Sequence, residues 1–158
     1  LYFPYHAMIK QLLVATRAKF SAAVLVDCHS MPSTGSAIEG DSGRRRCDFV
    51  LGDRFGTSCD PAIVDLFEKC LIDMGYSVAR NDPYAGGFVT QNYGRPNERI
   101  HALQIEINRG LYMDEAAIER TPEMAKLTDS LGKLITRLGT VDPSSLRPPP
   151  QVYADAAQ

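Results

Sequence analysis

The sequence predicts an α/β fold with a mainly parallel mixed sheet flanked by helices. Short apolar runs of strand length alternate with amphipathic segments of helical length along most of the chain, which is the pattern of this fold class. The run from Ala22 to Cys28 is apolar throughout and contains β-branched residues, as expected of a strand covered on both faces. A strand, a helix and a second strand between residues 47 and 81 have the spacing of a parallel crossover.

Three segments carry the apolar periodicity of helices, and they cover residues 4–20, 61–74 and 121–138. The second has the clearest ends. Asp60 and Pro61 form a favourable pair of N-cap and first-turn residues, and Gly75 is a typical stop. We expect the apolar face of each helix to pack against the sheet.

Four strands are expected, at residues 22–28, 47–53, 76–81 and 101–108. In the last of these, apolar residues alternate with Gln104, Glu106 and Asn108, so the three polar side chains share one face. Long irregular segments follow the first and third strands. We assign residues 1–141 to one α/β domain and residues 142–158 to a proline-rich tail, which we expect to be extended or disordered.

Composition favours a small-molecule partner. The formal net charge of −2 creates no strong field toward nucleic acid or an anionic membrane, and no apolar run approaches the roughly 20 residues that span a bilayer. The four cysteines form no CxxC pair, so we expect free thiols and a cytoplasmic protein. Cys59 is a weak candidate nucleophile, because no neighbouring base is evident. Since Leu1 is not a methionine, we expect the chain to be a piece of something longer.

The candidate functional residues close two of the expected strands. Asp27 and His29 end the first apolar run, and Glu106 lies on the polar face of the last strand. A histidine that binds Zn²⁺ and a carboxylate that deprotonates water would suit metal-assisted hydrolysis. A catalytic zinc site needs about three protein ligands, however, and the chain has three histidines and no HExxH motif. The simpler alternative is that Asp27 and His29 only hydrogen-bond neighbouring loops.

Four motifs follow one another along the chain: Asp27-Cys28-His29-Ser30, Asp48-Phe49-Val50-Leu51-Gly52-Asp53 with Gly56-Thr57-Ser58-Cys59, Asn81-Asp82-Pro83-Tyr84-Ala85-Gly86-Gly87, and Gln104-Ile105-Glu106-Ile107-Asn108-Arg109 with Leu111-Tyr112-Met113. In this order they resemble the N-formylglutamate amidohydrolase family, and the match covers nearly everything from Pro4 to about Leu138.

The resemblance implies a zinc-dependent hydrolase of the phosphorylase/hydrolase-like fold, related to zinc carboxypeptidases, that cleaves N-formylglutamate to formate and glutamate in histidine degradation. By this similarity His29 matches the metal histidine at a strand end and Glu106 the general base. Asp27 would orient the metal site. Arg109 and one of Arg44 to Arg46, for which we take Arg46, would receive the glutamate carboxylates. The pocket would be lined by Asn81, Gly86 and Gly87.

Two alternatives remain open at this point. The substrate could be another N-acyl amino acid, or the domain could bind an acidic small molecule without catalysis. The family also draws a histidine and a carboxylate for its metal from a segment that we expect to lie upstream of Leu1. We therefore expect this chain alone to bind zinc weakly and to have little activity.

Overall fold

The computed structural model describes residues 1–40 and 42–146. A four-stranded sheet in the order β1-β4-β2-β3 forms its centre. The strands are β1 (Ala23–Met31), β2 (Phe49–Gly52), β3 (Val78–Arg80) and β4 (Ile100–Asn108). β1 and β4 are parallel, as are β2 and β3, whereas β2 and β4 are antiparallel. The expected fold class, a mainly parallel mixed sheet flanked by helices, is confirmed.

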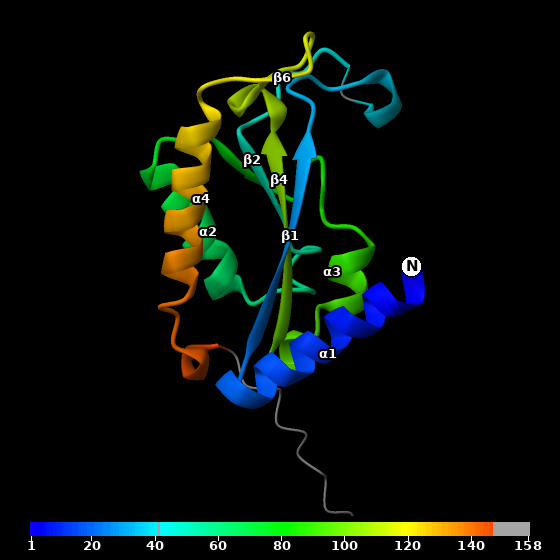
Figure 1. The fold of residues 1–158 in the computed structure, drawn as a ribbon, viewed down its shortest axis with the longest axis vertical. Helices are drawn as coiled ribbons and strands as arrows, with labels where there is room; N and C mark the ends of the chain where they lie inside the picture. Colours follow the sequence, from blue (N-terminus) through cyan, green and yellow to red (C-terminus); the bar gives the residue numbers. More distant parts are fainter. Residues whose placement is uncertain (41, 147–158) are drawn as a thin grey trace, which may run out of the picture.

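Helices cover both faces of this sheet (Figure 1). α2 (Pro61–Asp73) and α4 (Met124–Leu138) pack together on one face, while α1 (Tyr2–Phe20) and the short α3 (Phe88–Tyr93) lie on the other. A small hairpin of β5 (Met113–Asp114) and β6 (Glu119–Arg120) lies near the end of β4. Four 3₁₀ turns complete the order: η1 (Ala37–Glu39), η2 (Pro96–Glu98), η3 (Arg109–Leu111) and η4 (Pro143–Ser145).

The main core lies between the sheet and the α2–α4 pair. β4 contributes Leu103, Ile105 and Ile107 to it, because these alternate residues point to the same face. The opposite face of β4 carries Gln104, Glu106 and Asn108, as the alternation predicts, and all nine residues of the strand are buried. The polar face of β4 is therefore a buried surface and not a solvated one.

The start of α2 follows directly from its sequence. The side chain of Asp60 accepts a hydrogen bond from the backbone N–H of Ala62 at 2.9 Å, and Pro61 occupies the first turn. Gly75 follows the helix with a positive φ of 88°, a conformation that glycine adopts without steric cost. The predicted ends of this helix are thus confirmed. None of the helices in the described residues has the length and apolar character needed to span a bilayer.

Some predicted boundaries were wrong. β1 continues three residues beyond Cys28, because its backbone stays paired with β4 as far as Met31. The irregular segment predicted after Asn81 contains α3, which Gly87 begins as N-cap. The start of the predicted tail is also ordered: η4 forms at Pro143–Ser145, and Leu146 is buried in the main core. The tail residues 147–158 lie outside the described residues.

Candidate active site

The candidate active site lies where β1 and β4 run side by side. Their parallel register sets His29 opposite Glu106 and Asp27 opposite Gln104. His29 lies within β1, two residues before its last residue, and not beyond the strand as the sequence suggested. The reason is that backbone pairing with β4 continues past the apolar run, so polarity did not mark the end of the strand.

His29 lies between two carboxylates. Its Nε2 is 3.1 Å from Oδ2 of Asp27, which is hydrogen-bonding distance, and its Nδ1 is 3.7 Å from Oε1 of Glu106, which is too long for a direct hydrogen bond. The side chain of His29 is 48% exposed, whereas that of Glu106 is 8% exposed. The cluster therefore has an accessible imidazole in front of a buried carboxylate.

A short chain of hydrogen bonds fixes the Glu106 carboxylate. The side-chain NH₂ group of Gln104 donates to Oε1 of Glu106 at 2.8 Å. The side-chain carbonyl of Gln104 accepts from the backbone N–H of Gly87 at 2.7 Å. Because the N–H of Gly87 can only donate, it orients the amide so that its NH₂ group faces Glu106. Gly87, the N-cap residue of α3, thus helps to position the Glu106 side chain in the middle of the sheet.

Burial raises the pKa of the Glu106 carboxyl above its ordinary range. Desolvation is the largest cause and Asp27 acts in the same direction, while His29, the Gln104 hydrogen bond and Arg46 oppose it. A carboxyl with a raised pKa is better matched to proton transfer near neutral pH than an ordinary surface glutamate. Glu106 has the environment that a general base requires.

Arg46 reaches the same region from the segment before β2. Its side chain is buried, donates a hydrogen bond to the Tyr84 hydroxyl at 2.5 Å and lies with Cζ 5.2 Å from the centre of the Tyr84 ring. Its charge also lowers the pKa of Glu106. Tyr84 had no local signal in the sequence that would have identified it as the partner of Arg46.

The remaining predicted residues lie at the margins of the cluster. Arg109 follows β4 directly, and its Nε lies 3.5 Å from the hydroxyl of Ser30, which follows His29 in β1 and therefore points to the other face of the sheet. Asn81 donates to the Asp53 carboxylate at 2.7 Å and accepts from the Asp53 backbone N–H at 3.1 Å. The amide of Asn81 therefore joins two loops, and its assignment to the pocket lining stays a prediction.

The Gly86–Gly87 pair brings its loop close to the sheet. Gly86 has a φ of 113°, and a Cβ atom placed on Gly52 would lie 2.7 Å from the Gly86 nitrogen, so the two backbones meet where no side chain would fit. This close approach carries Gly87 to Gln104. The close approach of Gly86 to Gly52 explains why the two glycines lie near the cluster.

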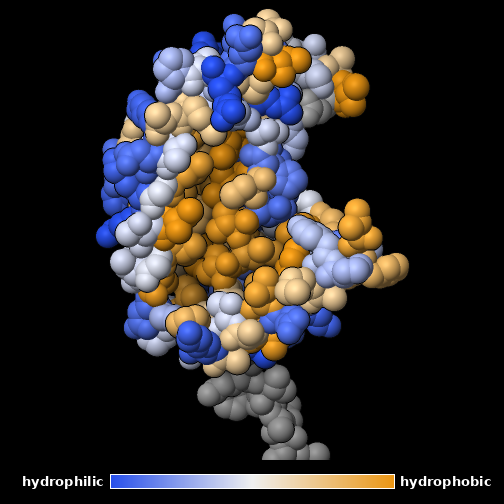
Figure 2. Space-filling model, in the orientation of Figure 1, coloured by the Kyte–Doolittle hydropathy of each residue, from blue (hydrophilic) through white to orange (hydrophobic). Residues whose placement is uncertain are grey.

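The outline of the molecule is hollowed on one side (Figure 2). In the orientation shared with Figure 1, the hollow lies between the segment that follows β1 and the α1–α3 side. Gly87, at the start of α3, reaches the cluster through Gln104, and the charge of Arg46 acts on Glu106.

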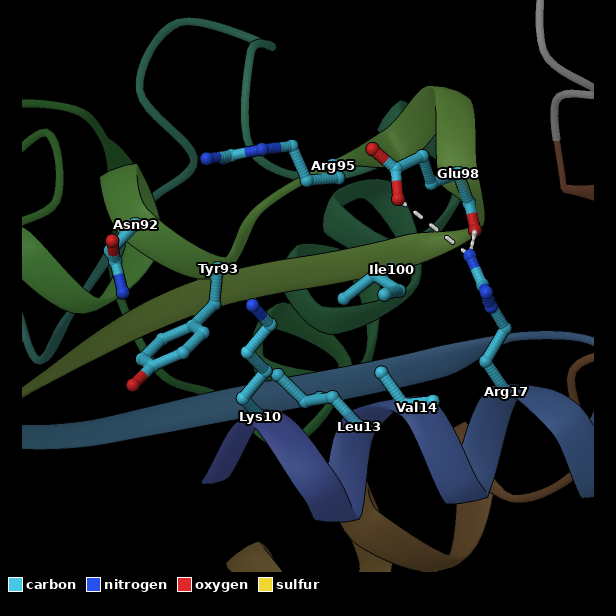
Figure 3. Close-up of a pocket in the computed structure, with 9 residues that line it drawn as sticks. All are labelled: Lys10, Leu13, Val14, Arg17, Asn92, Tyr93, Arg95, Glu98 and Ile100. Carbon is cyan, nitrogen blue, oxygen red and sulfur yellow. Dashed lines mark hydrogen bonds and ion pairs between the residues drawn. The ribbon is translucent and has the colours of Figure 1, made fainter. Parts of the chain in front are cut away.

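A separate cavity of about 370 Å³ lies between α1 and the α3–η2 segment (Figure 3). It has an apolar floor of Leu13, Val14 and Ile100, with Lys10 and an Arg17–Glu98 ion pair at its rim. None of the predicted site residues lines it. It therefore does not belong to the cluster.

Zinc does not fit the described residues by themselves. His29, Asp27 and Glu106 are of the chemical types that bind zinc, but the described part of the chain contains no group of three or more histidine, cysteine, aspartate or glutamate residues placed to hold an ion. Cys59 adds no alternative chemistry, because it is fully buried and burial raises the pKa of its thiol.

Comparison with known proteins identifies the family. The model of the N-formylglutamate amidohydrolase family matches residues 1–113. The chain belongs to this family. N-formylglutamate deformylases of Pseudomonas aeruginosa and Pseudomonas putida are 40% and 36% identical to it over 116 and 114 residues. These matches cover 72% and 71% of this chain but only 42% and 41% of the relatives, so the chain spans about two fifths of their length.

Solved structures agree with this assignment. The crystal structure of N-formylglutamate amidohydrolase from Ralstonia eutropha superposes with a TM-score of 0.79 at 43% identity. The match covers 92% of this chain and 51% of the Ralstonia eutropha chain. A protein of Agrobacterium tumefaciens shares the fold at a TM-score of 0.59 and 22% identity, over 88% of this chain and 52% of its own. The family fold is thus about twice as long as the part seen here.

Proposed function

We propose that this chain carries part of the active site of an amidohydrolase that cleaves N-formyl-L-glutamate to formate and L-glutamate. The Pseudomonas relatives are named for this reaction, and the chain spans only part of their length. The observation that supports the proposal most directly is the pairing of the accessible His29 with the buried Glu106 at facing positions of two strands. A location in the cytoplasm and a role in histidine degradation stay predictions.

Glu106 is the proposed general base. Hydrolysis of a formyl amide requires removal of a proton from the attacking water and delivery of a proton to the leaving nitrogen. Glu106 can perform both transfers in turn, because burial holds its pKa above the ordinary range and Gln104 fixes one of its oxygens. Oδ2 of Asp27 lies 3.1 Å from Nε2 of His29, and Asp27 is proposed to hold the imidazole in front of Glu106.

The arginines are proposed to bind the substrate carboxylates. Arg109 follows β4 directly, and its guanidinium is proposed to receive one carboxylate of the glutamyl group in a bidentate contact. Arg46 is buried against Tyr84 at the same end of the sheet and is the second candidate. Gly86 and Gly87 are proposed to line the pocket, with the Gly87 N–H already used by Gln104.

Zinc dependence is part of the proposal for the longer protein. His29 is the one described residue that we assign as a ligand, and a catalytic zinc site requires about three protein ligands. We therefore derive no step through a metal from these residues. Elemental analysis tests the assignment: this chain should hold far less than one zinc per molecule, and a stoichiometric, tightly bound zinc would show that the ligands are wrongly placed.

A binding domain without catalysis is the second candidate function. The incomplete ligand set among the described residues favours it, since the same cluster and Arg109 could hold an acidic small molecule without a metal. A related enzyme with another N-acyl amino acid as substrate is the nearest alternative within catalysis. Good turnover of such a compound, with no formate released from N-formylglutamate, would favour that substrate.

Formate release from N-formyl-L-glutamate by the full-length protein tests the reaction, and Glu106→Gln tests the base. The substitution should lower kcat by about 10²–10⁴-fold while calorimetry still shows substrate binding, because the amide keeps the size of the carboxyl but cannot take a proton. The matched control is Glu98→Gln, at an exposed glutamate in η2, which should leave kcat unchanged. Unchanged turnover in Glu106→Gln would rule out the proposed role.

A further inference from the structure

The cavity between α1 and the α3–η2 segment is held open by contacts at both of its ends (Figure 3). At one end Nδ1 of His6 lies 2.5 Å from the hydroxyl of Tyr93. At the other end the Arg17 guanidinium lies 3.7 Å from the Glu98 carboxylate. The space between these contacts, about 370 Å³, lies within the range of roughly 300–1,000 Å³ that small-molecule sites occupy.

The floor of this cavity is apolar. It is formed by Leu13 and Val14 of α1 and by Ile100, the first residue of β4. Leu13 and Ile100 are buried, whereas Val14 is 45% exposed. An apolar group that lies on the floor would remove the surface of Val14 from water, which is favourable. The floor therefore favours a ligand with an apolar body.

The polar side chains of the cavity carry an excess of positive charge. Three of them are cations, from Lys10, Arg17 and Arg95, and one is the Glu98 carboxylate, which is paired with Arg17. Within the described residues, neither Lys10 nor Arg95 pairs with a carboxylate. An anion in the cavity would therefore meet two cations that the described fold does not neutralise.

The Arg95 guanidinium is held in place and can still bind an anion. Its Nη1 donates to the backbone carbonyls of Gln91 and Gly94, at 3.0 and 2.7 Å. A guanidinium has several further N–H donors, in a planar arrangement that suits the two oxygens of a carboxylate. Arg95 is thus oriented by the backbone before any ligand arrives.

Lys10 and Arg95 lie at one end of the apolar floor. In Figure 3 their charged groups are on one side of Ile100, and the Arg17–Glu98 pair is on the other side. We propose that this cavity binds an organic carboxylate, whose acidic group is held by Lys10 and Arg95 and whose apolar body lies on the floor.

The charge and the floor together exclude other classes of ligand. A cation of the same shape would be repelled by Lys10 and Arg95. A neutral compound would leave both cations unpaired, and an inorganic anion would leave the floor exposed to water. The cavity shares no lining residue with the His29–Glu106 cluster, so the inference holds whatever reaction the protein catalyses.

Calorimetry with the full-length protein tests the inference, and 4-phenylbutanoate is the probe. Three control compounds each lack one required feature: 4-phenylbutan-1-ol, 4-phenylbutylamine and inorganic phosphate. At low ionic strength the probe should bind at least about tenfold more tightly than any of them, because charge-assisted hydrogen bonds and apolar contact then act together. Equal affinity for the probe and the alcohol would show that no cation holds the acidic group, and it would overturn the inference.

Val14→Glu and Val14→Gln form a matched pair of variants. Both place a side chain of the same size over the floor, but only glutamate adds a negative charge. Val14→Glu should raise the Kd of the probe about tenfold or more relative to Val14→Gln, because like charges repel. Both variants should fold, since Val14 is partly exposed and both new residues favour helices, and circular dichroism checks this. An equal Kd in the two variants would contradict a site on this floor.

Lys10→Gln and Arg95→Gln remove the proposed contacts to the acidic group, and each should raise the Kd about fivefold or more. Lys19→Gln is the matched control, at an exposed lysine of α1 that does not line the cavity, and it should leave the Kd unchanged. Arg109→Gln should also leave the Kd unchanged, because Arg109 belongs to the candidate active site. Loss of binding in Arg109→Gln, an unchanged Kd in both cavity variants, or no saturable binding of the probe would overturn the inference.

Discussion

β4 lies in the middle of the sheet and β1 at its edge, although the two strands carry Glu106 and His29 at facing positions. All nine residues of β4 are buried, whereas three consecutive residues of β1 are exposed. The contrast separates two requirements of a catalytic site. The central strand supplies a desolvated, hydrogen-bonded carboxylate with a raised pKa, and the edge strand supplies an imidazole that a ligand can reach.

The same contrast shows where the stability of the described fold resides. β4 contributes three apolar side chains to the main core on one face and a hydrogen-bonded polar group on the other. The apolar residues of β1 pack on both faces, with Val24 and Val26 against the main core and Ala23 and Leu25 in a second cluster with α1, but most of them are only partly buried. The outer edge of β1 has no partner strand within the described residues. Substitutions in the two strands should therefore differ in cost even when the chemical change is the same.

The largest effect is expected from matched leucine substitutions in the two strands. Leu103→Ala in β4 should lower the free energy of unfolding by about 2–5 kcal/mol, because Leu103 is fully buried in the main core. Leu25→Ala in β1 should cost roughly 1 kcal/mol, since this side chain is only partly buried. Urea denaturation of both variants measures the difference. Equal costs would show that β1 is packed as tightly as β4.

Glu106→Gln should remove a pH dependence of stability that originates in β4. The folded-state pKa of Glu106 is raised above its ordinary value of 4.5, so the folded protein keeps a proton that the unfolded chain releases. The stabilisation from this proton is complete below pH 4.5 and is lost as the pH rises through the raised pKa. Unfolding of wild type and variant between pH 4 and 8, with a chelator present, should show the decline only in wild type.

Much of the architecture was predictable because local rules determine it. The Asp60–Pro61 pair placed the start of α2, and the crossover spacing predicted that β2 and β3 would be parallel. Alternation along β4 placed Gln104 and Glu106 on one face, and the hydrogen bond between them is a direct consequence. The signal for Gln104 as a partner of Glu106 was thus already present in the sequence.

The unpredicted features depend on contacts between distant segments. The antiparallel pairing of β2 with β4 sets the strand order, and no local pattern encodes it. The extension of β1 through His29 depends on pairing with a strand some 75 residues later, as the register shows. Arg46 and Tyr84 meet across 38 residues of sequence, so their contact required the folded loops. Each of these features depends on contacts between segments that are distant in the sequence.

His101 should give β4 a second pH dependence, of opposite sign. Its ring is fully buried, Nδ1 accepts from the Asp60 backbone N–H at 3.2 Å, and Nε2 has no hydrogen-bond partner among the described residues. Burial lowers the pKa of His101 below its ordinary value of 6.5. Its neutral form therefore stabilises the fold fully above pH 6.5, and this contribution is lost as the pH falls toward the lowered pKa.

His101→Gln tests this loss of stability on acidification. The side-chain carbonyl of glutamine can replace Nδ1 as the acceptor for the backbone N–H of Asp60. Thermal unfolding between pH 5 and 7 should show a smaller loss of Tm on acidification in this variant than in wild type. A slope that stays the same in His101→Gln would mean that another group causes the acid sensitivity. The raised pKa of Glu106 acts in the opposite direction, so the test is best made in the Glu106→Gln background.

The smallest effect concerns Cys28, the exposed thiol of β1. Desolvation by its neighbours, followed by the charge of Asp27, raises the pKa of Cys28 above its ordinary value of 9.0, so less thiolate is present at neutral pH. A thiol reagent should label Cys28 in the folded chain more slowly than free cysteine, and Asp27→Asn should speed the labelling by a few-fold. Cys59, which is fully buried, should be labelled only on unfolding. Labelling of Cys59 at the rate of Cys28 would contradict the contrast between an open β1 edge and a closed core.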